Sequence, residues 1–170
     1  MSDGQGPGDA ELERAEIDEL AASWSRAWTE GAGFAACCTV GISYEDPLAI
    51  QPLMGLDPVE RHAAALREAF PDVRVERTAP ALQRGGHACI PWRLLGTHLG
   101  KLAGLPGTEE RLVIHGLHYL ELTDGRISRA RGFFDLYDGS IQLGLLPSRG
   151  GLGESALLLL RGFGLRRGKR

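Results

Sequence analysis

The spacing of apolar residues changes near residue 73, and this change constrains the fold more than any other feature of the sequence. Before it, apolar residues recur every three or four positions, as on one face of an α-helix. After it, apolar and polar residues alternate over several segments separated by turn residues, which is typical of half-buried β-strands. Helices followed by a run of antiparallel strands predict an α+β domain, with helices on one face of a curved sheet.

Two long helices are expected in the first 70 residues. The first covers residues 9–30, and its apolar stripe includes Trp24 and Trp28. The second starts at Asp57, whose carboxylate can cap its first turn, and ends at Pro71. Both tryptophans are expected in the core, and in a cup-shaped fold Trp28 would also line a ligand site.

Three strands are expected in the second half of the chain, at residues 87–98, 111–122 and 126–135. The paired glycines 85–86 and the Asp-Gly pair at 124–125 are typical hairpin turns before the first and the last of them. His98 and His118 fall on apolar strand faces. A single histidine in such a place is usually a hydrogen-bonded core residue, but two on neighbouring strands can share one concave interior.

Length and composition limit the kinds of protein to which the chain can belong. The 170 residues suffice for one domain with a core, and the net charge of −3 gives no reason to expect nucleic acid. No apolar run approaches the roughly 20 residues that span a bilayer, and the N-terminus lacks the features of a signal peptide. An odd cysteine count, with Cys37 beside Cys38, predicts a reducing cytoplasm and buried thiols rather than disulfides; a reactive cysteine is the second choice.

The ends of the chain differ from the middle. Residues 1–8 are expected to form a flexible leader, residues 9–147 the domain, and residues 148–170 a tail with an apolar run before basic residues. Such a tail suits weak binding to a membrane surface or a short helix on a neighbouring subunit. Gly162 and Gly164 weaken a long amphipathic helix, which favours the subunit and makes a membrane partner unexpected.

Asp135 follows two phenylalanines at the end of the last expected strand. Strict alternation places it on one face with Arg131 and Phe133. If this face points inward, burial would raise the pKa of Asp135 above about 3.9 and suit a general acid and base, while Arg131 would keep it ionised. An aspartate that caps or turns the chain at the strand end is an equally good interpretation.

Several short motifs in chain order resemble the SnoaL-like polyketide cyclases, within the nuclear transport factor two-like fold. The resemblance covers residues 9–147, and none of its motifs is specific alone. They are YEDP at 44–47, AFPD at 69–72, W-x-x-x-GTH-x-G at 92–100, GLP at 104–106, DGRI at 124–127, FFD at 133–135 and QLGLLP at 142–147.

The resemblance implies a cone-shaped domain with an internal pocket. It implies that Asp135 is the catalytic acid–base, with His118 on the preceding strand beside it. The implied reaction is the intramolecular aldol ring closure of a small apolar polyketide ester, with no metal and no organic cofactor. The positions expected to bind substrate are Tyr44, Trp28, Trp92, His98, Arg131 and Phe133.

The chain also departs from the family pattern. Arg131 stands where family members often carry an aromatic residue, Thr108-Glu109 replaces a turn, and residues 48–55 form an apolar insertion that would lid the pocket or pack a subunit interface. Two alternatives therefore remain open: a non-catalytic small-molecule-binding or interaction module of the same fold, and an isomerase or epoxide hydrolase-type enzyme. Leucines on the uncovered sheet face predict a homo-oligomer, either a dimer or a tetramer.

Overall fold

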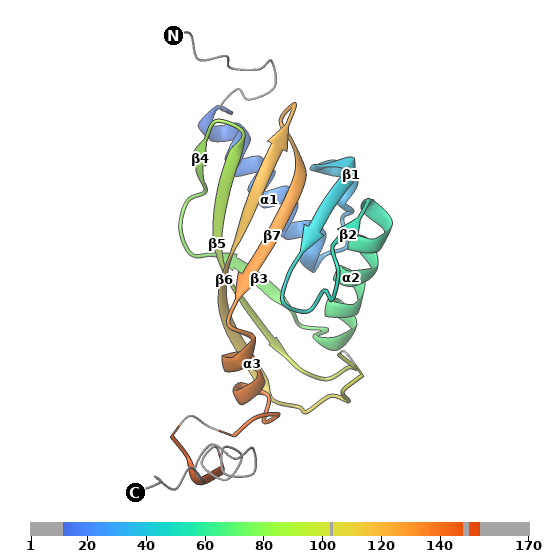
Figure 1. The fold of residues 1–170 in the computed structure, drawn as a ribbon, viewed down its shortest axis with the longest axis vertical. Coiled ribbons are helices and arrows are strands. Elements are labelled where there is room, and N and C mark those ends of the chain that lie inside the picture. Colours follow the sequence, from blue (N-terminus) through green and yellow to red (C-terminus); the bar gives the residue numbers. More distant parts are fainter. Residues whose placement is uncertain (1–11, 103, 148–149, 154–170) are drawn as a thin grey trace, which may run out of the picture.

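The computed structural model describes residues 12–102, 104–147 and 150–153 (Figure 1). The predicted leader, and all but a few residues of the predicted tail, lie outside the described residues. In chain order, the elements are α1 (Arg14–Thr29), the 3-10 helix η1 (Phe34–Ala36), β1 (Cys38–Glu45), β2 (Leu53–Met54), α2 (Leu56–Ala69), β3 (Arg74–Arg77), β4 (Leu82–Arg84), β5 (His87–Thr97), β6 (Arg111–Thr123), β7 (Arg126–Phe134) and α3 (Leu136–Gln142).

The strands form one curved, open sheet in the order β2-β1-β7-β6-β5-β3, with β4 also paired to β5. The predicted α+β class with helices on a curved sheet is confirmed, but the sheet is mixed rather than wholly antiparallel. The exception is β1, which runs parallel to β7. It comes from the helical half of the chain and pairs with the last strand, so no hairpin dictates its direction.

Both long helices form where the apolar spacing predicts them. Side-chain and backbone groups of Glu13 and Glu16 bond reciprocally at the start of α1, which satisfies amide groups that the helix leaves free. The expectation that Asp57 caps α2 was wrong. The cap position is Gly55, with a φ of 86° that suits glycine. Asp57 lies in the first turn, where its negative charge interacts favourably with the helix dipole.

A β-bulge in β7 decides which of its side chains face the core. Opposite β6, Leu122 pairs with Ile127 but Glu121 pairs with Arg129, so Ser128 is an extra residue in the ladder. A one-residue shift exchanges the two faces of a strand. Beyond Ser128, Ala130 and Gly132 are therefore buried, and Arg129, Arg131 and Phe133 are exposed.

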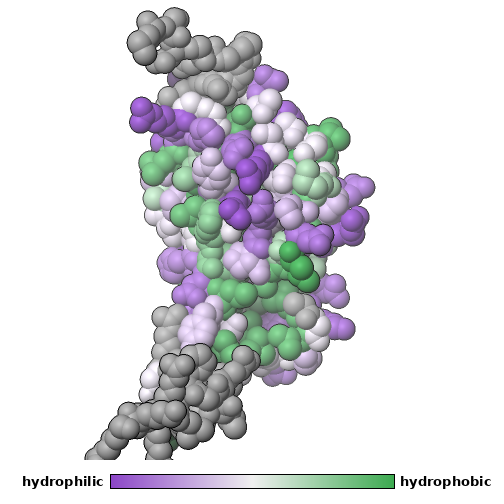
Figure 2. Space-filling model, in the orientation of Figure 1, coloured by the Kyte–Doolittle hydropathy of each residue, from purple (hydrophilic) through white to green (hydrophobic). Residues whose placement is uncertain are grey.

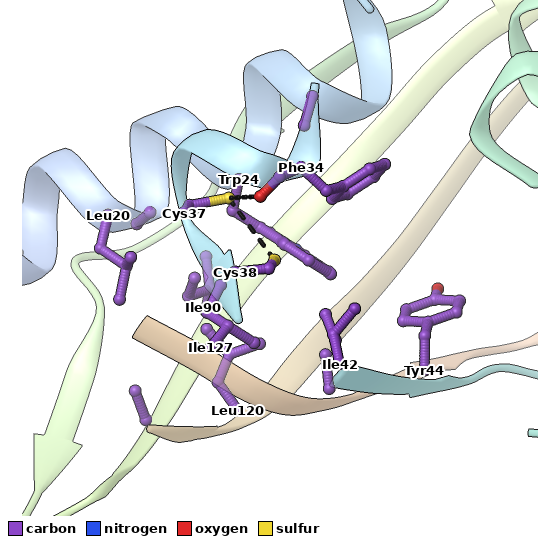
Figure 3. Close-up of a cluster of buried hydrophobic side chains, with 14 of the residues drawn as sticks. Leu20, Trp24, Phe34, Cys37, Cys38, Ile42, Tyr44, Ile90, Leu120 and Ile127 are labelled. Carbon is purple, nitrogen blue, oxygen red and sulfur yellow. Dashed lines mark hydrogen bonds between the residues drawn. The ribbon is translucent and has the colours of Figure 1, made fainter. Parts of the chain in front are cut away.

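The main core lies between the helices and the inner face of the sheet. Figure 3 shows side chains of α1, of the segment after it and of the strands pointing into this shared core. Cys37 and Cys38 belong to it, which confirms the prediction that these thiols are buried, while Cys89 is partly buried. A second apolar cluster surrounds Phe70 and Trp92, toward α3.

Among the described residues, no helix lies across the opposite face of the sheet (Figure 1), and hydrophobic side chains gather on part of that side (Figure 2). Leu117 and Phe133 are 37% and 47% exposed there. Within the described part of the chain, no helix is both long and apolar enough to cross a membrane.

Candidate active site

A buried carboxylate lies just after β1. Both oxygens of Asp46 are used: Oδ1 accepts hydrogen bonds from the backbone N–H groups of Leu48 and Ala49 at 2.8 and 2.9 Å. Oδ2 accepts from the Tyr44 hydroxyl at 2.9 Å and lies 2.8 Å from Nε2 of His62 on α2. The Asp46 side chain is only 5% exposed, whereas that of His62 is 22% exposed. The cluster thus connects a buried acid to a partly accessible imidazole.

Opposing effects set the charge of Asp46. Burial raises the pKa of Asp46. The hydrogen bond and charge of His62, together with the hydrogen bonds from Tyr44 and the Leu48 amide, lower it by more than burial raises it. The net pKa lies below the ordinary value of 3.8, so the carboxylate is ionised at neutral pH. Burial and the neighbouring carboxylate raise the pKa of Tyr44 well above its usual range, which keeps its hydroxyl a neutral donor.

This lowered pKa predicts an acid-sensitive contribution to stability. Because the folded pKa of Asp46 lies below the unfolded value of about 3.9, its contribution is present above that value and is lost as the pH falls through the folded pKa. Urea unfolding at a series of pH values should therefore show a steeper loss of stability below about pH 4 in the native chain than in Asp46→Asn. Parallel curves would mean that Asp46 does not carry this effect.

His118 is a neutral imidazole on the inner face of β6. Its Nδ1 lies 3.1 Å from Nε1 of Trp24. An indole nitrogen only donates, so Nδ1 accepts and the ring proton lies on Nε2. Burial lowers the pKa of His118 to about 3, against a smaller opposing effect of the Asp46 charge. At neutral pH His118 can therefore donate a hydrogen bond from Nε2 but does not carry a positive charge.

Aromatic rings surround His118. Trp28 stacks nearly parallel to it at 5.9 Å and 14°, and Trp92 lies at 5.2 Å and 35°. Tyr44 is 6.2 Å away. Tyr44, Trp28, Trp92 and His118 thus lie together on the inner side of the sheet.

Gly132 lies between the buried carboxylate and the imidazole. It pairs with His118 across β6 and β7. On its other side, β1 pairs Glu45 with Arg131, which brings the next residue, Asp46, alongside. A Cβ at position 132 would lie 3.0 Å from the Tyr44 hydroxyl, 3.2 Å from Asp46 Cβ and 3.5 Å from His118 Cδ2. The glycine lets these three side chains approach one another across the backbone of β7.

An open cleft of about 450 Å³ reaches this cluster at the end of β1 and β7. Asp46 and Gly132 line it, and the segment after β1 forms one wall, where Ile50 is fully exposed. The apolar insertion at residues 48–55 therefore borders the cleft, as its expected role as a lid over the pocket requires. The lining residues are Glu45, Asp46, Pro47, Ala49, Ile50, Gln51, Pro52, Arg131, Gly132 and Phe133.

Arg131 and Phe133 stand at the cleft from the outer face of the sheet rather than inside the cone. The Arg131 guanidinium bonds to Glu45 at 2.9 Å and lies 5.7 Å from the centre of the Phe133 ring. Their expected inward orientation was wrong, because the bulge at Ser128 turned this face outward. They can still contact a ligand that occupies the cleft.

Asp135 also points outward, so its predicted orientation into an apolar pocket was wrong. It is exposed and occupies the N-cap of α3, where its Oδ1 accepts the backbone N–H of Asp138 at 2.9 Å. A capping aspartate was the other interpretation open from the sequence. The acid–base role predicted for Asp135 required burial, and the structure places a buried carboxylate at Asp46 instead.

His98 lies apart from this cluster, at the far end of β5. It is fully buried and stacks on Phe70 at 5.2 Å, with Nδ1 3.2 Å from the Thr108 hydroxyl. His98 was expected to share the interior with His118, but along one strand it lies about 20 Å from Trp92 at 3.3 Å per residue. His98 instead packs on Phe70 of the second core cluster, away from Trp92 and His118.

The capping role of Asp135 predicts a small effect on stability and none on chemistry. Asp135→Ala should lower the free energy of unfolding by about 1 kcal/mol, because α3 loses its cap, while Asp135→Asn should be nearly neutral, since asparagine also caps. Thermal or urea unfolding measures both variants. Equal destabilisation by alanine and asparagine would show that the carboxylate charge, not the cap, is what matters.

The curved sheet, its helical cover and the polar groups on its inner face define the cone-shaped class of nuclear transport factor two-like domains. The family model of SnoaL-like polyketide cyclases matches residues 17–143. The chain therefore belongs to the SnoaL-like polyketide cyclase family.

Solved structures share the fold. TsrD from Streptomyces laurentii is 20% identical with a TM-score of 0.71, over 80% of this chain and 100% of that one. A SnoaL-like protein from Jannaschia sp. CCS1 is 18% identical with a TM-score of 0.69, over 86% and 100%. IdmH from Streptomyces antibioticus is 18% identical with a TM-score of 0.64, over 75% and 98%. At these identities the likeness establishes the fold alone, and no curated protein sequence matched the chain significantly.

Proposed function

We propose that the chain is a cofactor-free acid–base enzyme that closes a ring in a small, apolar, polyketide-type substrate by an intramolecular aldol reaction. The observation that carries this proposal is the buried, ionised Asp46 in the lining of a cleft, with neutral His118 on the other side of Gly132. Family membership supports the polyketide class of substrate.

In this proposal Asp46 is the base. A carboxylate with a lowered pKa can remove only a proton that is already acidic, such as that of a methylene between two carbonyl groups. A polyketide ester contains such a methylene. The proton stays on Asp46 until it is returned to the product, while His62 Nε2, 2.8 Å from Oδ2, donates to the carboxylate and keeps it ionised before the reaction. A proton carrier of this kind contributes about 10²–10⁴-fold in rate.

His118 is assigned to the carbonyl oxygen. Its Nε2–H can donate to the oxygen on which negative charge develops when the carbon–carbon bond forms, and the low-dielectric surroundings strengthen that bond. A neutral imidazole suits this role because it gives no proton away before the bond forms. The proton removed from the methylene then returns to the oxygen of the attacked carbonyl, which completes the aldol without any net change in protons.

A non-catalytic binding module is the second candidate. Much of the interior between α1 and the sheet is filled by Trp24, Trp28, Phe34 and Tyr44, which pack edge to face or tilted at 5.0–6.1 Å. Such packing restricts the ligand to the neighbourhood of the cleft. An isomerase would use the same acid and base on a substrate that lacks a second carbonyl for ring closure.

Incubation with aryl 1,3-dicarbonyl methyl esters distinguishes these candidates. The proposal predicts a ring-closed product that forms faster than in buffer, detected by mass spectrometry and chromatography. Tight binding without any product would favour the binding module, and proton exchange without ring closure would favour the isomerase. Absence of both binding and product would contradict the proposal.

The partners and the compartment are part of the proposal. We propose a small-molecule substrate, no nucleic acid, a cytoplasmic location and a homo-oligomer, either a dimer or a tetramer. Exposed Leu117 and Phe133 on the uncovered sheet face support a subunit contact. Light scattering of the full chain measures the assembly directly, and a strictly monomeric mass would contradict this part.

A further inference from the structure

We infer that Cys37 and Cys38 form a redox-active dithiol, which hydrogen peroxide oxidises to a disulfide between adjacent residues and which a thiol such as glutathione reduces again. This inference does not depend on the proposed function, because neither cysteine belongs to the lining of the cleft. It adds a site of reversible modification where η1 meets β1.

The two sulfur atoms contact each other in the main core. Sγ of Cys37 lies 3.7 Å from Sγ of Cys38 and also 3.7 Å from the carbonyl oxygen of Phe34 (Figure 3). A thiol has one proton, and that of Cys37 is directed to Phe34, so Cys38 donates within the pair. A disulfide has an S–S length of about 2.05 Å, so rotation of the two side chains that closes the gap by less than about 2 Å is sufficient.

The surroundings give the two thiols different reactivities. The hydrogen bond with Cys38 lowers the pKa of Cys37 below its ordinary value of 9.0; burial opposes this effect, and a hydrogen bond from Ser23 and the charge of Arg126 add to it. The same hydrogen bond, together with burial, raises the pKa of Cys38. The thiolate is the reactive form of cysteine. Cys37 is therefore the nucleophile of the pair, and Cys38 is the thiol that responds to it.

The oxidation takes place in two steps. The Cys37 thiolate attacks one oxygen of hydrogen peroxide, so that an S–O bond forms, the O–O bond breaks, and hydroxide leaves and takes up a proton as water. Cys38 then attacks the sulfenic acid sulfur of Cys37: an S–S bond forms, the S–O bond breaks, and the proton of Cys38 leaves with the oxygen as a second water. The sulfurs lose the two electrons that the peroxide gains.

The pair is buried but follows an exposed stretch of the chain. Cys37 and Cys38 are each 2% exposed, whereas Ala35 and Ala36 just before them are exposed, as is Val40 just after them. Hydrogen peroxide is little larger than water, so a small local opening of the structure admits it.

The ladder between β1 and β7 is irregular directly after Cys38. Cys38 pairs with Ile127, and the next pair is Ser43 with Arg129, so four residues of β1 lie opposite one residue of β7. Backbone outside a regular ladder opens more readily than a paired strand. The same irregularity gives the chain room to adjust when the two side chains join.

The spacing of the two residues makes the disulfide easy to reduce. Adjacent Cα atoms are about 3.8 Å apart, which is shorter than the roughly 4.4–6.8 Å that ordinary disulfides span. A disulfide forced into a shorter span is strained and more readily reduced. The dithiol is therefore the resting form under reducing conditions, and the disulfide forms when peroxide is present.

Mass spectrometry of the full chain after exposure to hydrogen peroxide at neutral pH tests this inference on the unmodified sequence. Trypsin releases residues 27–61 as one peptide, which contains Cys37 and Cys38 but not Cys89. After the remaining thiols are alkylated in denaturant, this peptide should lack two hydrogens and carry no alkyl group. Glutathione should restore both thiols. Cys89, which has no neighbouring cysteine in the sequence, should still be alkylated when the pair is oxidised.

Two serine variants test the roles of the two thiols. Serine in Cys38→Ser can still donate to Cys37, so this variant should form a sulfenic acid at Cys37, trapped by dimedone, without a disulfide. Cys37→Ser keeps only the thiol whose proton is held more tightly. Its Cys38 should react with peroxide at least about 10-fold more slowly than Cys37 does in Cys38→Ser. If either variant does not fold, the peptide of the native chain decides.

The inference is overturned if Cys37 and Cys38 are both still alkylated once Cys89 has been oxidised. Equal reaction rates in the two serine variants, or oxidation that glutathione does not reverse, would overturn it as well. None of these results bears on the proposed function, which turnover of the ester and its loss in Asp46→Asn decide. Failure of that turnover would in turn leave the result for the two thiols unchanged.

Discussion

Asp46→Asn is expected to lower kcat/KM for a polyketide-type ester by about 10²–10⁴-fold, the usual contribution of a general base. The side chains have the same shape, and asparagine Oδ1 can still accept the amides of Leu48 and Ala49 at the observed 2.8 and 2.9 Å. The amide nitrogen, however, cannot take a proton from the substrate. Initial rates over a range of substrate concentrations separate a fall in kcat from a rise in KM.

Asp135→Asn is the matched control for this substitution. Its carboxylate also accepts a backbone amide, at 2.9 Å, but it is exposed and caps α3. We expect unchanged turnover in this variant, since asparagine preserves the cap. Full activity of Asp46→Asn would remove Asp46 from the mechanism, and circular dichroism of both variants excludes unfolding as the cause of any loss.

Gly116→Ala is expected to lower the free energy of unfolding by about 3 kcal/mol, at the upper end of the cost of overpacking. Gly116 pairs with Trp92 across β5 and β6. A Cβ there would lie 2.5 Å from two atoms of the Trp92 ring and 2.6 Å from the Phe133 carbonyl oxygen. A rigid ring and a backbone atom cannot both move aside, so either Trp92 or the β6–β7 ladder must be displaced.

Gly41→Ala is the control for this prediction. Gly41 lies in β1, and a Cβ there would have no atom within 4 Å. Its effect should stay within about 0.5 kcal/mol, as for other surface substitutions. Urea unfolding gives both values, and an equal effect of the two substitutions would mean that Trp92 does not pack over β6 as described.

Periodicity predicted the elements well because burial on one face produced it. The buried side chains of α1 are those of the predicted stripe, including Trp24 and Trp28. The three long strands β5, β6 and β7 lie within one residue of their predicted bounds. Period-two alternation survives in β5 and β6 because they pair over eleven residue pairs without a register shift.

The orientation of Asp135 could not be predicted from the alternation of apolar and polar residues. It depended on strict alternation along the last strand, and one extra residue at Ser128 reversed the faces after it. No glycine or proline marks that bulge in the sequence. The same shift brought Gly132 to the inner face, where a residue without a side chain gives no sign of a site.

The buried acid was missed because His62 and Gly132, two of the residues that surround it, are distant in the sequence. Asp46 belongs to the YEDP motif, and an aspartate before a proline is typical of a turn. His62 lies on α2 and reaches Asp46 only in the folded chain. The parallel pairing of β1 with β7, which places Asp46 next to Gly132, has no local signal either.

The most direct test of Asp46 as the base is the exchange of the activated methylene protons of a 1,3-dicarbonyl ester with deuterated solvent. Measured by mass spectrometry at neutral pH, this exchange follows proton removal without requiring ring closure. We predict that the native chain and Asp135→Asn accelerate it equally and that Asp46→Asn does not accelerate it above buffer. Exchange that persists in Asp46→Asn and disappears in Asp135→Asn would contradict the account.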